Sequence, residues 1–246
     1  MEPLGLLLGA VGLAAGGVLK GATGAGAPIL AVPLLAIFYD VPTAVALFTF
    51  PNLLSNAWQG WTYRADRASD GLTERFAIGG LLGAFAGSIV LASASATLLI
   101  LLVACAVFLY IAFRLLRPDW TLSRGAGRRL GFGAGTLGGV LQGAAGLSAP
   151  VSITFLNAMR LERRVFIATI SIFFFAMSLV QIPTLAALGI LDLHLAGLSL
   201  LACLPLFGAM PAGAWLARRL SKEAFDRIIL GLLAVVALRL VWSAVG

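Results

Sequence analysis

A short stretch rich in glycine and ending in proline occurs twice in this 246-residue chain, each time inside strongly apolar sequence. Residues 16–28 read GGVLKGATGAGAP and residues 138–150 read GGVLQGAAGLSAP, so nine of the thirteen positions are identical at a constant offset of 122 residues. Glycine and proline interrupt helices, and a matched pair of interrupted apolar segments is typical of the binding site of a membrane transporter. The repeat therefore predicts two related halves, each with a break in its first helical segment.

The composition places the chain in a membrane. Hydrophobic residues make up 61% of it and charged residues only 11%, whereas a soluble protein carries about 25% charged residues. The net charge of +7 comes from short loops between apolar segments, as the positive-inside rule predicts, so we expect no nucleic-acid partner. Cys105 and Cys203 both fall inside apolar segments, which favours reduced thiols over a disulfide.

Ten apolar segments can be read along the chain. They cover residues 4–20, 28–39, 43–63, 76–93, 96–116, 130–141, 150–159, 165–188, 195–217 and 225–245. Segments of about 18 residues or more can cross a hydrocarbon core of ~30 Å. Residues 28–39 and 150–159 are too short to cross, and each directly follows one of the glycine-rich stretches. Each of them is therefore expected to be half of a broken helix or one arm of a re-entrant hairpin.

The loops carry an alternating pattern of charge. Lys and Arg gather in residues 64–75, 114–129, 160–164 and 218–227, and are missing from the connections near residues 40, 93–95 and 192–194. The basic loops should face the cytoplasm, which leaves both chain termini outside. In each pair of corresponding loops only one is basic, so the halves should have opposite orientations. The predicted fold is an all-α polytopic membrane protein with two inverted-topology repeats, residues 1–116 and 130–246, joined by a basic cytoplasmic linker at 117–129.

The few ionisable residues indicate whether the substrate is an anion or a cation. All ten acidic residues lie in loops or at segment ends, which argues against a metal-cation carrier and against a carboxylate proton relay. The single histidine, His194, lies in a loop, so no metal site, cofactor or enzymatic activity is expected. Lys20 is the exception, a basic residue inside an apolar segment directly before the first break. Together with the positive ends of the helices that start after each break, Lys20 predicts an anion site.

The break and its polar surroundings supply the candidate site residues. Gly21, Pro28, Gly143 and Pro150 are the predicted helix-break residues. Polar side chains that are duplicated, or that share a helix face with each other, complete the site, although amides can also simply bond neighbouring helices. The predicted substrate-binding residues are Lys20, Thr23, Gly24, Gly26, Asn52, Asn56, Gln59, Gln142, Gly146, Ser148, Ser171 and Gln181.

Another group of glycines has a structural interpretation. Gly79, Gly83 and Gly87 are spaced four residues apart in one apolar segment. This small-xxx-small spacing predicts close packing against a second helix rather than contact with a substrate.

The doubled motif resembles a known family. The stretch from Lys20 to Leu35, KGATGAGAPILAVPL, and its second copy from Gln142 to Pro150, QGAAGLSAP, are similar to the TauE/SafE family of sulfite exporters. The resemblance covers essentially the whole chain and implies transport of sulfite, sulfonates or related organosulfur anions across the plasma membrane. It also implies that the signature breaks are formed by Gly24, Gly26, Pro28, Gly146, Ser148 and Pro150. Ala25, Leu147 and Ser148 depart from a glycine-rich pattern.

These inferences predict a secondary transporter of the plasma (inner) membrane that exports sulfite or a short sulfonate by alternating access. Its partners would be this small anion and the lipid bilayer. Two alternatives stay open: an uptake permease for thiosulfate or another sulfur anion, and a non-transporting membrane assembly subunit. The sequence leaves the oligomeric state open, as well as the choice between proton coupling and an electrogenic leak.

Overall fold

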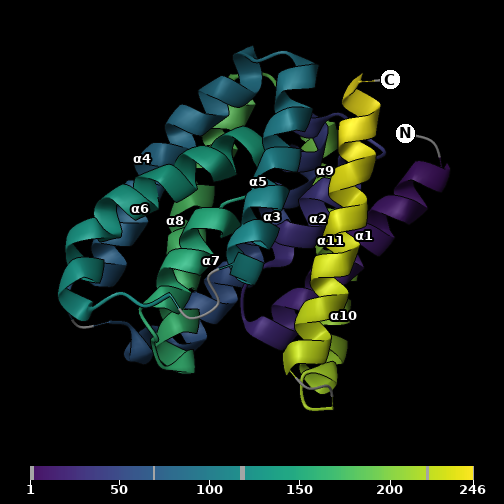
Figure 1. The fold of residues 1–246 in the computed structure, drawn as a ribbon. Helices are drawn as coiled ribbons and strands as arrows, with labels where there is room; N and C mark the ends of the chain where they lie inside the picture. Colours follow the sequence, from purple (N-terminus) through teal and green to yellow (C-terminus); the bar gives the residue numbers. More distant parts are fainter. Residues whose placement is uncertain (1–2, 69, 117–119, 220–221, 246) are drawn as a thin grey trace.

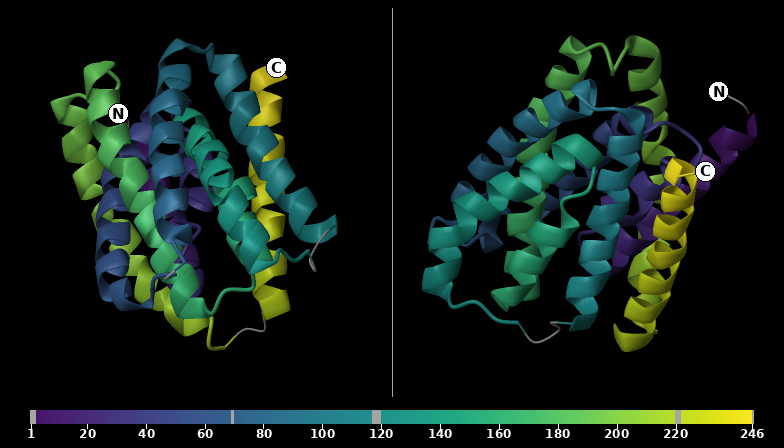
Figure 2. Two further views of the ribbon diagram at one scale, coloured as in Figure 1. Left: turned by 90° about the vertical axis from the view of Figure 1, so that its left-hand side faces the viewer. Right: turned by 45° about the horizontal axis from the view of Figure 1, so that its top comes forward.

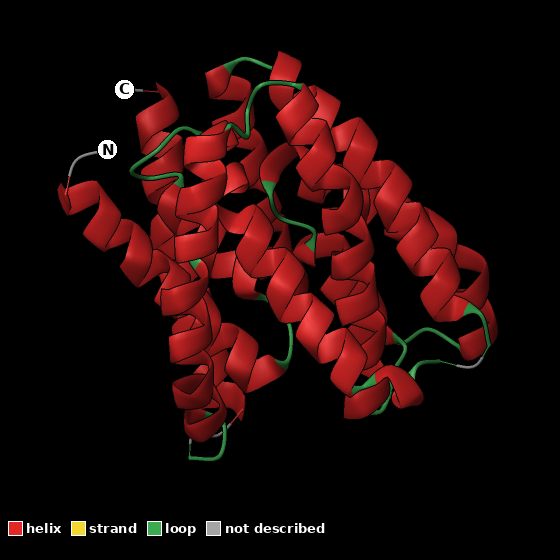
Figure 3. Cartoon of the chain, turned by 180° about the vertical axis from the view of Figure 1, so that it is seen from behind, coloured by secondary structure: helices red, strands yellow, loops and turns green. Residues whose placement is uncertain are grey.

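The computed structural model describes residues 3–68, 70–116, 120–219 and 222–245, and these are 85% helical with no strand. The helices are joined by short loops (Figure 3). They are α1 (Pro3–Thr23), α2 (Ala27–Leu35), α3 (Val41–Thr62), the 3-10 turn η1 (Arg64–Asp66), α4 (Leu72–Ser93), α5 (Ala96–Leu116), α6 (Arg124–Ala145), α7 (Ala149–Ala158), α8 (Arg163–Ala187), α9 (Leu193–Leu201), α10 (Cys203–Leu216) and α11 (Lys222–Val245). The all-α class expected from the sequence is confirmed.

Within the described residues, four helical stretches are long and apolar enough to cross a membrane. They are Leu72–Ser93, Ala96–Leu116, Arg163–Ala187 and Leu193–Leu216. The last of these joins α9 to α10 through Ala202, where the helical assignment is interrupted. These spans agree with a multi-pass membrane protein.

The first two helices form a hairpin. A Cβ added to Gly16 would meet Ala31, one added to Gly12 would meet Leu34, and Gly5 lies close to the Tyr39 ring. Residues earlier in α1 thus contact residues later in the chain at α2 and beyond, which means that α2 runs antiparallel to α1. The first glycine-rich stretch is therefore the turn of a helical hairpin.

The second glycine-rich stretch forms a matching hairpin. Gly138 of α6 lies against Ser148 and Ser152 at the start of α7, while Gly127 near the start of α6 lies against Met159, just beyond the end of α7. Pro150 stands in the first turn of α7, as Pro28 does in α2. Proline fits there because the first-turn N–H has no intrahelical acceptor to lose.

The break positions differ in part from the prediction. Helix α1 continues to Thr23 and α6 continues to Ala145, so the turns are formed by residues 24–26 and 146–148. Gly21 and Gly143, predicted as helix-break residues, lie inside helices instead. A Cβ on Gly21 would overlap the Met210 carbonyl oxygen, and a Cβ on Gly143 would overlap that of Ala84. These two glycines serve close helix packing, because a helix tolerates glycine where a second backbone approaches.

Glycines also hold α4 against α6. A Cβ on Gly79, Gly83 or Gly87 would overlap the carbonyl oxygens of α6, and Gly135 and Gly139 make the reciprocal contacts with α4. The packing role predicted for the glycines of α4 is confirmed. Figure 1 shows this α4–α6 pair on one side of the molecule and α1 with α10 on the other, with α3 and α8 packed against each other between them.

Helix α3 contains a proline, Pro51, and a side chain of α9 replaces the hydrogen bond that this proline removes. Pro51 has no N–H, so the carbonyl oxygen of Leu47 loses its partner four residues on. The Ser199 hydroxyl of α9 donates to that oxygen at 2.9 Å, and the Phe50 N–H donates to the Ser199 oxygen at 3.1 Å. Ser199 is fully buried. It therefore fixes α3 at the turn that precedes Asn52.

The connections divide between two ends of the molecule. The α4–α5 and α8–α9 connections lie at the end that also holds both termini, whereas the described parts of the α5–α6 and α10–α11 connections lie at the opposite end (Figures 1 and 2). Helix α6 begins at Arg124, inside the stretch expected as a linker. The basic residues Arg124, Arg128 and Arg129 thus lie on the first turns of a helix rather than in a loop.

Candidate functional site

A buried chain of hydrogen bonds starts at Lys20. The Lys20 ammonium donates to Asn56 Oδ1 at 2.8 Å, and Asn56 Nδ2 donates to Asn52 Oδ1 at 2.8 Å. Asn52 Nδ2 donates to the Ser178 hydroxyl at 3.0 Å, which donates in turn to the Phe174 carbonyl oxygen. Lys20 is only 2% exposed, and its three polar partners are equally buried. The chain joins α1, α3 and α8 through side chains alone.

The direction of these hydrogen bonds is uniform. Every donor points away from Lys20, so the amide oxygens of Asn56 and Asn52 are turned toward the ammonium. Among the described residues, no carboxylate forms an ion pair with Lys20. A buried cation held only by neutral dipoles is costly in an apolar interior, and such residues mark functional sites in membrane proteins.

Further predicted site residues extend this chain to α6. We call the whole set the polar seam: Lys20, Asn52, Asn56, Gln59, Gln142, Ser171, Ser178 and Gln181. Ser171 of α8 donates to Gln59 Oε1 of α3 at 3.4 Å, and Gln181 Nε2 of α8 donates to the Gln142 carbonyl oxygen of α6 at 3.4 Å. The Gln142 Oε1 atom is buried and has no hydrogen-bond partner among the described residues. The structure therefore gathers most of the predicted amides and hydroxyls on the facing sides of α3 and α8.

The glycines of the two turns adopt the conformation that only glycine adopts readily. Gly24, Gly26 and Gly146 have φ values of 80°, 87° and 68°, which strain any L side chain. Gly24 also packs against Ile167 of α8, and Gly146 packs against Val45 of α3. Each turn thus rests against one of the two central helices that carry the polar seam.

The two turns differ in their surroundings. The first turn borders a cavity of about 590 Å³. In the second turn Leu147 and Ser148 are fully buried, and the Ser148 hydroxyl pairs with that of Ser152 at 2.9 Å. Ala25 and Gly26 of the first turn line this cavity although they are buried, and Pro150 and Val151, directly after the second turn, line a separate cavity of about 430 Å³.

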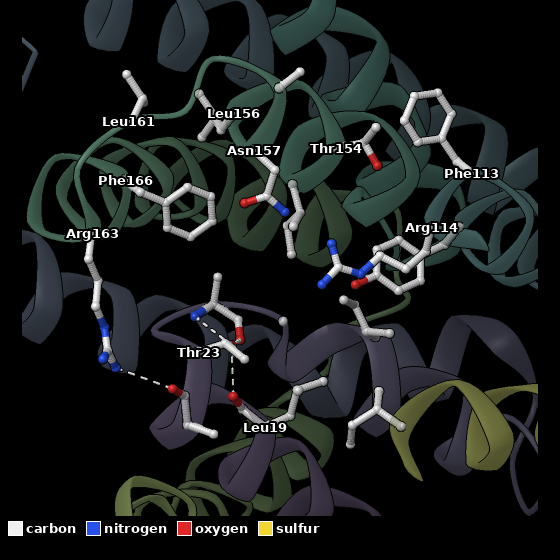
Figure 4. A pocket seen from close by; sticks show the side chains of 18 of the residues that line it. Leu19, Thr23, Phe113, Arg114, Thr154, Leu156, Asn157, Leu161, Arg163 and Phe166 are labelled. Carbon is white, nitrogen blue, oxygen red and sulfur yellow. Dashed lines mark hydrogen bonds between the residues drawn. The ribbon is translucent and has the colours of Figure 1, made fainter. Parts of the chain in front are cut away.

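The cavity lies between α1, α2, α5, α7, the start of α8 and α11 (Figure 4). Of the predicted site residues, Thr23 and Gly26 line it, whereas Lys20, Asn52 and Asn56 do not. The Thr23 hydroxyl is bonded to the backbone of its own turn, through Leu19 O at 2.8 Å and through Ala25. The cavity and the polar seam therefore lie on different sides of the end of α1.

The charged residues of the cavity and several of its uncharged polar residues were not predicted from the sequence. Arg114, Arg160 and Arg163 line it together with Asn157. Their positions at helix ends and in a basic loop are already accounted for by the positive-inside rule. No pattern in the sequence separates these arginines from the other basic loop residues.

Metal-ligand residues do not cluster in the part of the chain that the structure describes. No group of three or more His, Cys, Asp and Glu side chains there could hold a metal ion.

Comparison with known proteins adds an independent finding. The family described as "Sulfite exporter TauE/SafE" matches residues 8–240 of the 246. Neither the curated proteins nor the solved structures gave a match to this chain. The matched range includes both glycine-rich turns, all of the polar seam and the cavity beside the first turn. The chain therefore belongs to the TauE/SafE family of membrane sulfite exporters.

Proposed function

We propose that this protein is a secondary transporter that moves a small sulfur oxyanion, sulfite or a short sulfonate, out of the cell by alternating access. The observation that carries the proposal is the Lys20 ammonium, buried between α1 and α3 and held by neutral amide oxygens. Family membership agrees with a membrane exporter of sulfite or a related anion. The residue-level site, the substrate, the direction and the mechanism are our proposal.

Lys20 suits an anion for electrostatic reasons. An ammonium group has three N–H donors, and Asn56 Oδ1 occupies one of them. An oxyanion could accept from the others without breaking the chain that runs to Asn52 and Ser178. In a site of low dielectric, attraction between unlike charges is many times stronger than in water. The charge of Lys20 would therefore stabilise bound sulfite and destabilise a bound cation.

An inverted repeat is supported by contacts that recur between the halves. Gly24 packs against Ile167, and Gly146 packs against Val45. Gly146 corresponds to Gly24 and Ile167 corresponds to Val45, each at the offset of 122 residues that relates the two glycine-rich stretches. A Cβ on Gly213 would overlap the Val18 carbonyl oxygen, just as one on Gly87 would overlap that of Val140. In each case a segment of one half contacts the other half. This reciprocal pattern is what an intramolecular two-fold relation produces.

Alternating access is supported by the difference between the two turns. Ala25 and Gly26 of the first turn line the cavity of about 590 Å³, whereas residues 146–148 of the second turn line neither this cavity nor the one of about 430 Å³ beside α7. If the halves are related by inversion, rocking them would close the first turn and open the second toward the other end. The structure would then represent the state open at the basic end.

The distribution of charge supports an orientation. The basic α5–α6 and α10–α11 connections lie at the same end of the molecule (Figure 2). The positive-inside rule assigns that end to the cytoplasm of a plasma (inner) membrane, which leaves both termini outside. The cavity then faces the cytoplasm, the side from which an exported anion would enter. The two halves, residues 1–116 and 130–246, would be the moving units around the linker 117–129.

A panel of sulfur oxyanions tests the proposed function. Purified protein in proteoliposomes is expected to move sulfite or a short sulfonate, and the transported anion is expected to raise the thermal unfolding temperature in detergent. Selective flux of thiosulfate would favour the uptake permease instead. A protein that neither moves nor binds any anion of the panel would be a non-transporting assembly subunit, and the proposal would be wrong.

A further inference from the structure

The polar seam contains a single charge. Lys20 is the one ionised side chain that is buried in the part of the chain that the structure describes, and the other buried polar side chains there are amides and hydroxyls. In an apolar interior an uncompensated charge is costly. An anion of charge −1 would neutralise Lys20, whereas an anion of charge −2 would leave a negative charge buried. The charge of the seam therefore favours a monoanion.

Gln142 holds the position in the second half that Lys20 holds in the first, at the offset of 122 residues. Gln142 is 2% exposed, and its Oε1 atom has no hydrogen-bond partner among the described residues. A Cβ on Gly138, one turn earlier on α6, would meet Phe173 of α8. Because positions four apart share a helix face, the side chain of Gln142 starts from the face of α6 that contacts α8.

Hydrogen bonds join Gln142 to the same seam as Lys20. The chain of side chains that starts at Lys20 reaches Ser178 of α8. Gln181 lies one turn further along α8, on the same face, and its Nε2 donates to the Gln142 carbonyl oxygen at 3.4 Å. The seam thus begins with an ammonium donor on α1 and ends with an amide on α6 whose oxygen is unsatisfied.

The unsatisfied atom is an acceptor, and this restricts the ligand that suits it. An amide oxygen pairs with an N–H or O–H donor, and a buried acceptor without a donor lowers stability. The dianions sulfite, sulfate and thiosulfate offer acceptor atoms alone. Hydrogensulfite, the singly protonated form of sulfite, has charge −1 and keeps one proton that it can donate.

We propose that the seam binds sulfite as hydrogensulfite, with Lys20 donating to its oxygens and Gln142 Oε1 accepting its proton. The inference rests on the proposed function and specifies the protonation state of the transported ion. Sulfite and hydrogensulfite interconvert near neutral pH, so both forms are present at the membrane surface. Each exported ion then carries its own proton, without a carboxylate to relay it.

Other titratable groups stand apart from Lys20 and Gln142. On α3 and on the helices packed against α1 and α6, the described groups are the carboxylate of Glu74, the thiols of Cys105 and Cys203, the phenol of Tyr110 and arginines at helix ends. None of them is a hydrogen-bond partner of Lys20 or Gln142. Lys20 is the one titratable member of the seam, so a test by pH needs an anion of fixed charge as its control.

Flux at several pH values tests the charge of the bound ion. In proteoliposomes, the half-saturating concentration of total sulfite should rise about tenfold per pH unit once the dianion predominates, because one proton accompanies binding. Methanesulfonate has a similar shape and charge −1 throughout this range, so its inhibition of sulfite flux should keep a constant affinity for the protein. Sulfate and thiosulfate should inhibit at least about tenfold more weakly than methanesulfonate.

Three outcomes of this experiment would overturn the proposal. A half-saturating concentration of total sulfite that stays constant or falls with rising pH would identify the dianion as the bound ion. An equal loss of affinity for sulfite and methanesulfonate would assign the effect to a group of the protein. Inhibition by sulfate as strong as that by methanesulfonate would show that the seam accepts two negative charges.

Gln142→Met tests the proton acceptor. Methionine keeps the length of the side chain and removes Oε1, so the half-saturating concentration of hydrogensulfite should rise about tenfold. Inhibition by methanesulfonate should stay within about twofold, since this anion has no proton to donate. Thermal unfolding in detergent should not fall, because the Gln181 bond goes to the backbone of residue 142 and remains.

Gln59→Met is the matched control. It makes the same substitution in the seam, but the Gln59 Oε1 atom already accepts from Ser171 at 3.4 Å. It should therefore change the affinities for hydrogensulfite and methanesulfonate by the same factor. Equal factors in Gln142→Met as well, or wild-type affinity of that variant for hydrogensulfite, would mean that Gln142 does not accept the proton.

Calorimetry separates this inference from the proposed function. If the wild type moves no sulfur anion but binds hydrogensulfite, and Gln142→Met weakens that binding and leaves methanesulfonate binding intact, the proposed function fails and the inference stands. If flux depends on Lys20 but follows the concentration of the dianion, the function stands and the inference is wrong.

Discussion

At the scale of single residues, the contact between Lys20 and Asn56 matters most for the proposed anion site. The ammonium is buried at 2% exposure and rests on one amide oxygen 2.8 Å away. An amide oxygen lowers the energy of the buried cation without cancelling its charge, so positive potential remains for a ligand. A carboxylate in its place would hold Lys20 more firmly and remove that potential. The side chain at position 56 therefore decides whether Lys20 can act as an anion site.

Asn56→Asp tests this directly. The substitution keeps the shape of the side chain and places a carboxylate against Lys20, so sulfite affinity should fall about tenfold or more as an ion pair replaces the available charge. Titration calorimetry of purified protein measures the loss. Gln59→Glu adds the same charge on the same helix, where the partner is the Ser171 hydroxyl, and should cost less. Equal losses in both variants would mean that Lys20 has no special part.

At the scale of helices, one hydroxyl compensates for a proline. Pro51 leaves the Leu47 carbonyl oxygen without its helical partner, and Ser199 of α9 donates to it at 2.9 Å. Ser199→Ala would leave that buried oxygen unsatisfied and should destabilise the protein by about 1–3 kcal/mol. Thermal unfolding in detergent measures the change. Ser93→Ala removes an exposed hydroxyl that bonds only its own helix and should be nearly neutral. Similar stability of both variants would contradict this role of Ser199.

The contact between α4 and α6 depends on the absence of side chains. A Cβ on Gly83 would overlap the Thr136 carbonyl oxygen, so Gly83→Ala must separate two backbones and should cost about 1–3 kcal/mol. Gly133 of α6 has nothing within 4 Å of an added Cβ. Gly133→Ala should therefore stabilise the helix by roughly 0.5–1 kcal/mol. The two variants should shift the thermal unfolding temperature in opposite directions, and a shift in the same direction would show that packing does not decide the effect.

At the scale of the whole molecule, the two ends differ in charge and in the predicted side of the membrane. Leu193, the first residue of α9, is 93% exposed, and the α8–α9 connection directly before it lies at the end that holds the termini (Figure 2). Gly125 at the start of α6 lies at the opposite, basic end, with free space around it. In a background with Cys105→Ser and Cys203→Ala, Leu193→Cys should react with a membrane-impermeant maleimide in intact cells. Gly125→Cys should react only after permeabilisation. The reverse pattern would invert the orientation and turn the open cavity outward.

The sequence predicted most of this architecture because its strongest signals are physical ones. Hydropathy marks helices, and the thirteen-residue repeat marks the turns at residues 24–26 and 146–148. The buried partners of Lys20 were found because amides in an apolar segment must find partners. Gly21 and Gly143 were misplaced because glycine marks both a break and a close helix contact, and only the neighbouring backbone distinguishes them. Arg114, Arg163 and Asn157 were not predicted because the sequence does not show which residues at helix ends converge on a cavity.

Flux of radiolabelled sulfite through Lys20→Met proteoliposomes tests the central claim most directly. Methionine keeps the length and apolar character of the stem, and it removes the charge together with the hydrogen bond to Asn56 Oδ1. Thermal unfolding in detergent therefore first establishes that the variant is folded, since a buried oxygen without a donor lowers stability. Its sulfite flux should fall to the level of empty vesicles, while wild-type vesicles accumulate the anion. If folded Lys20→Met protein moves sulfite as fast as the wild type and with the same half-saturation, the buried ammonium is not the anion site and this account is wrong.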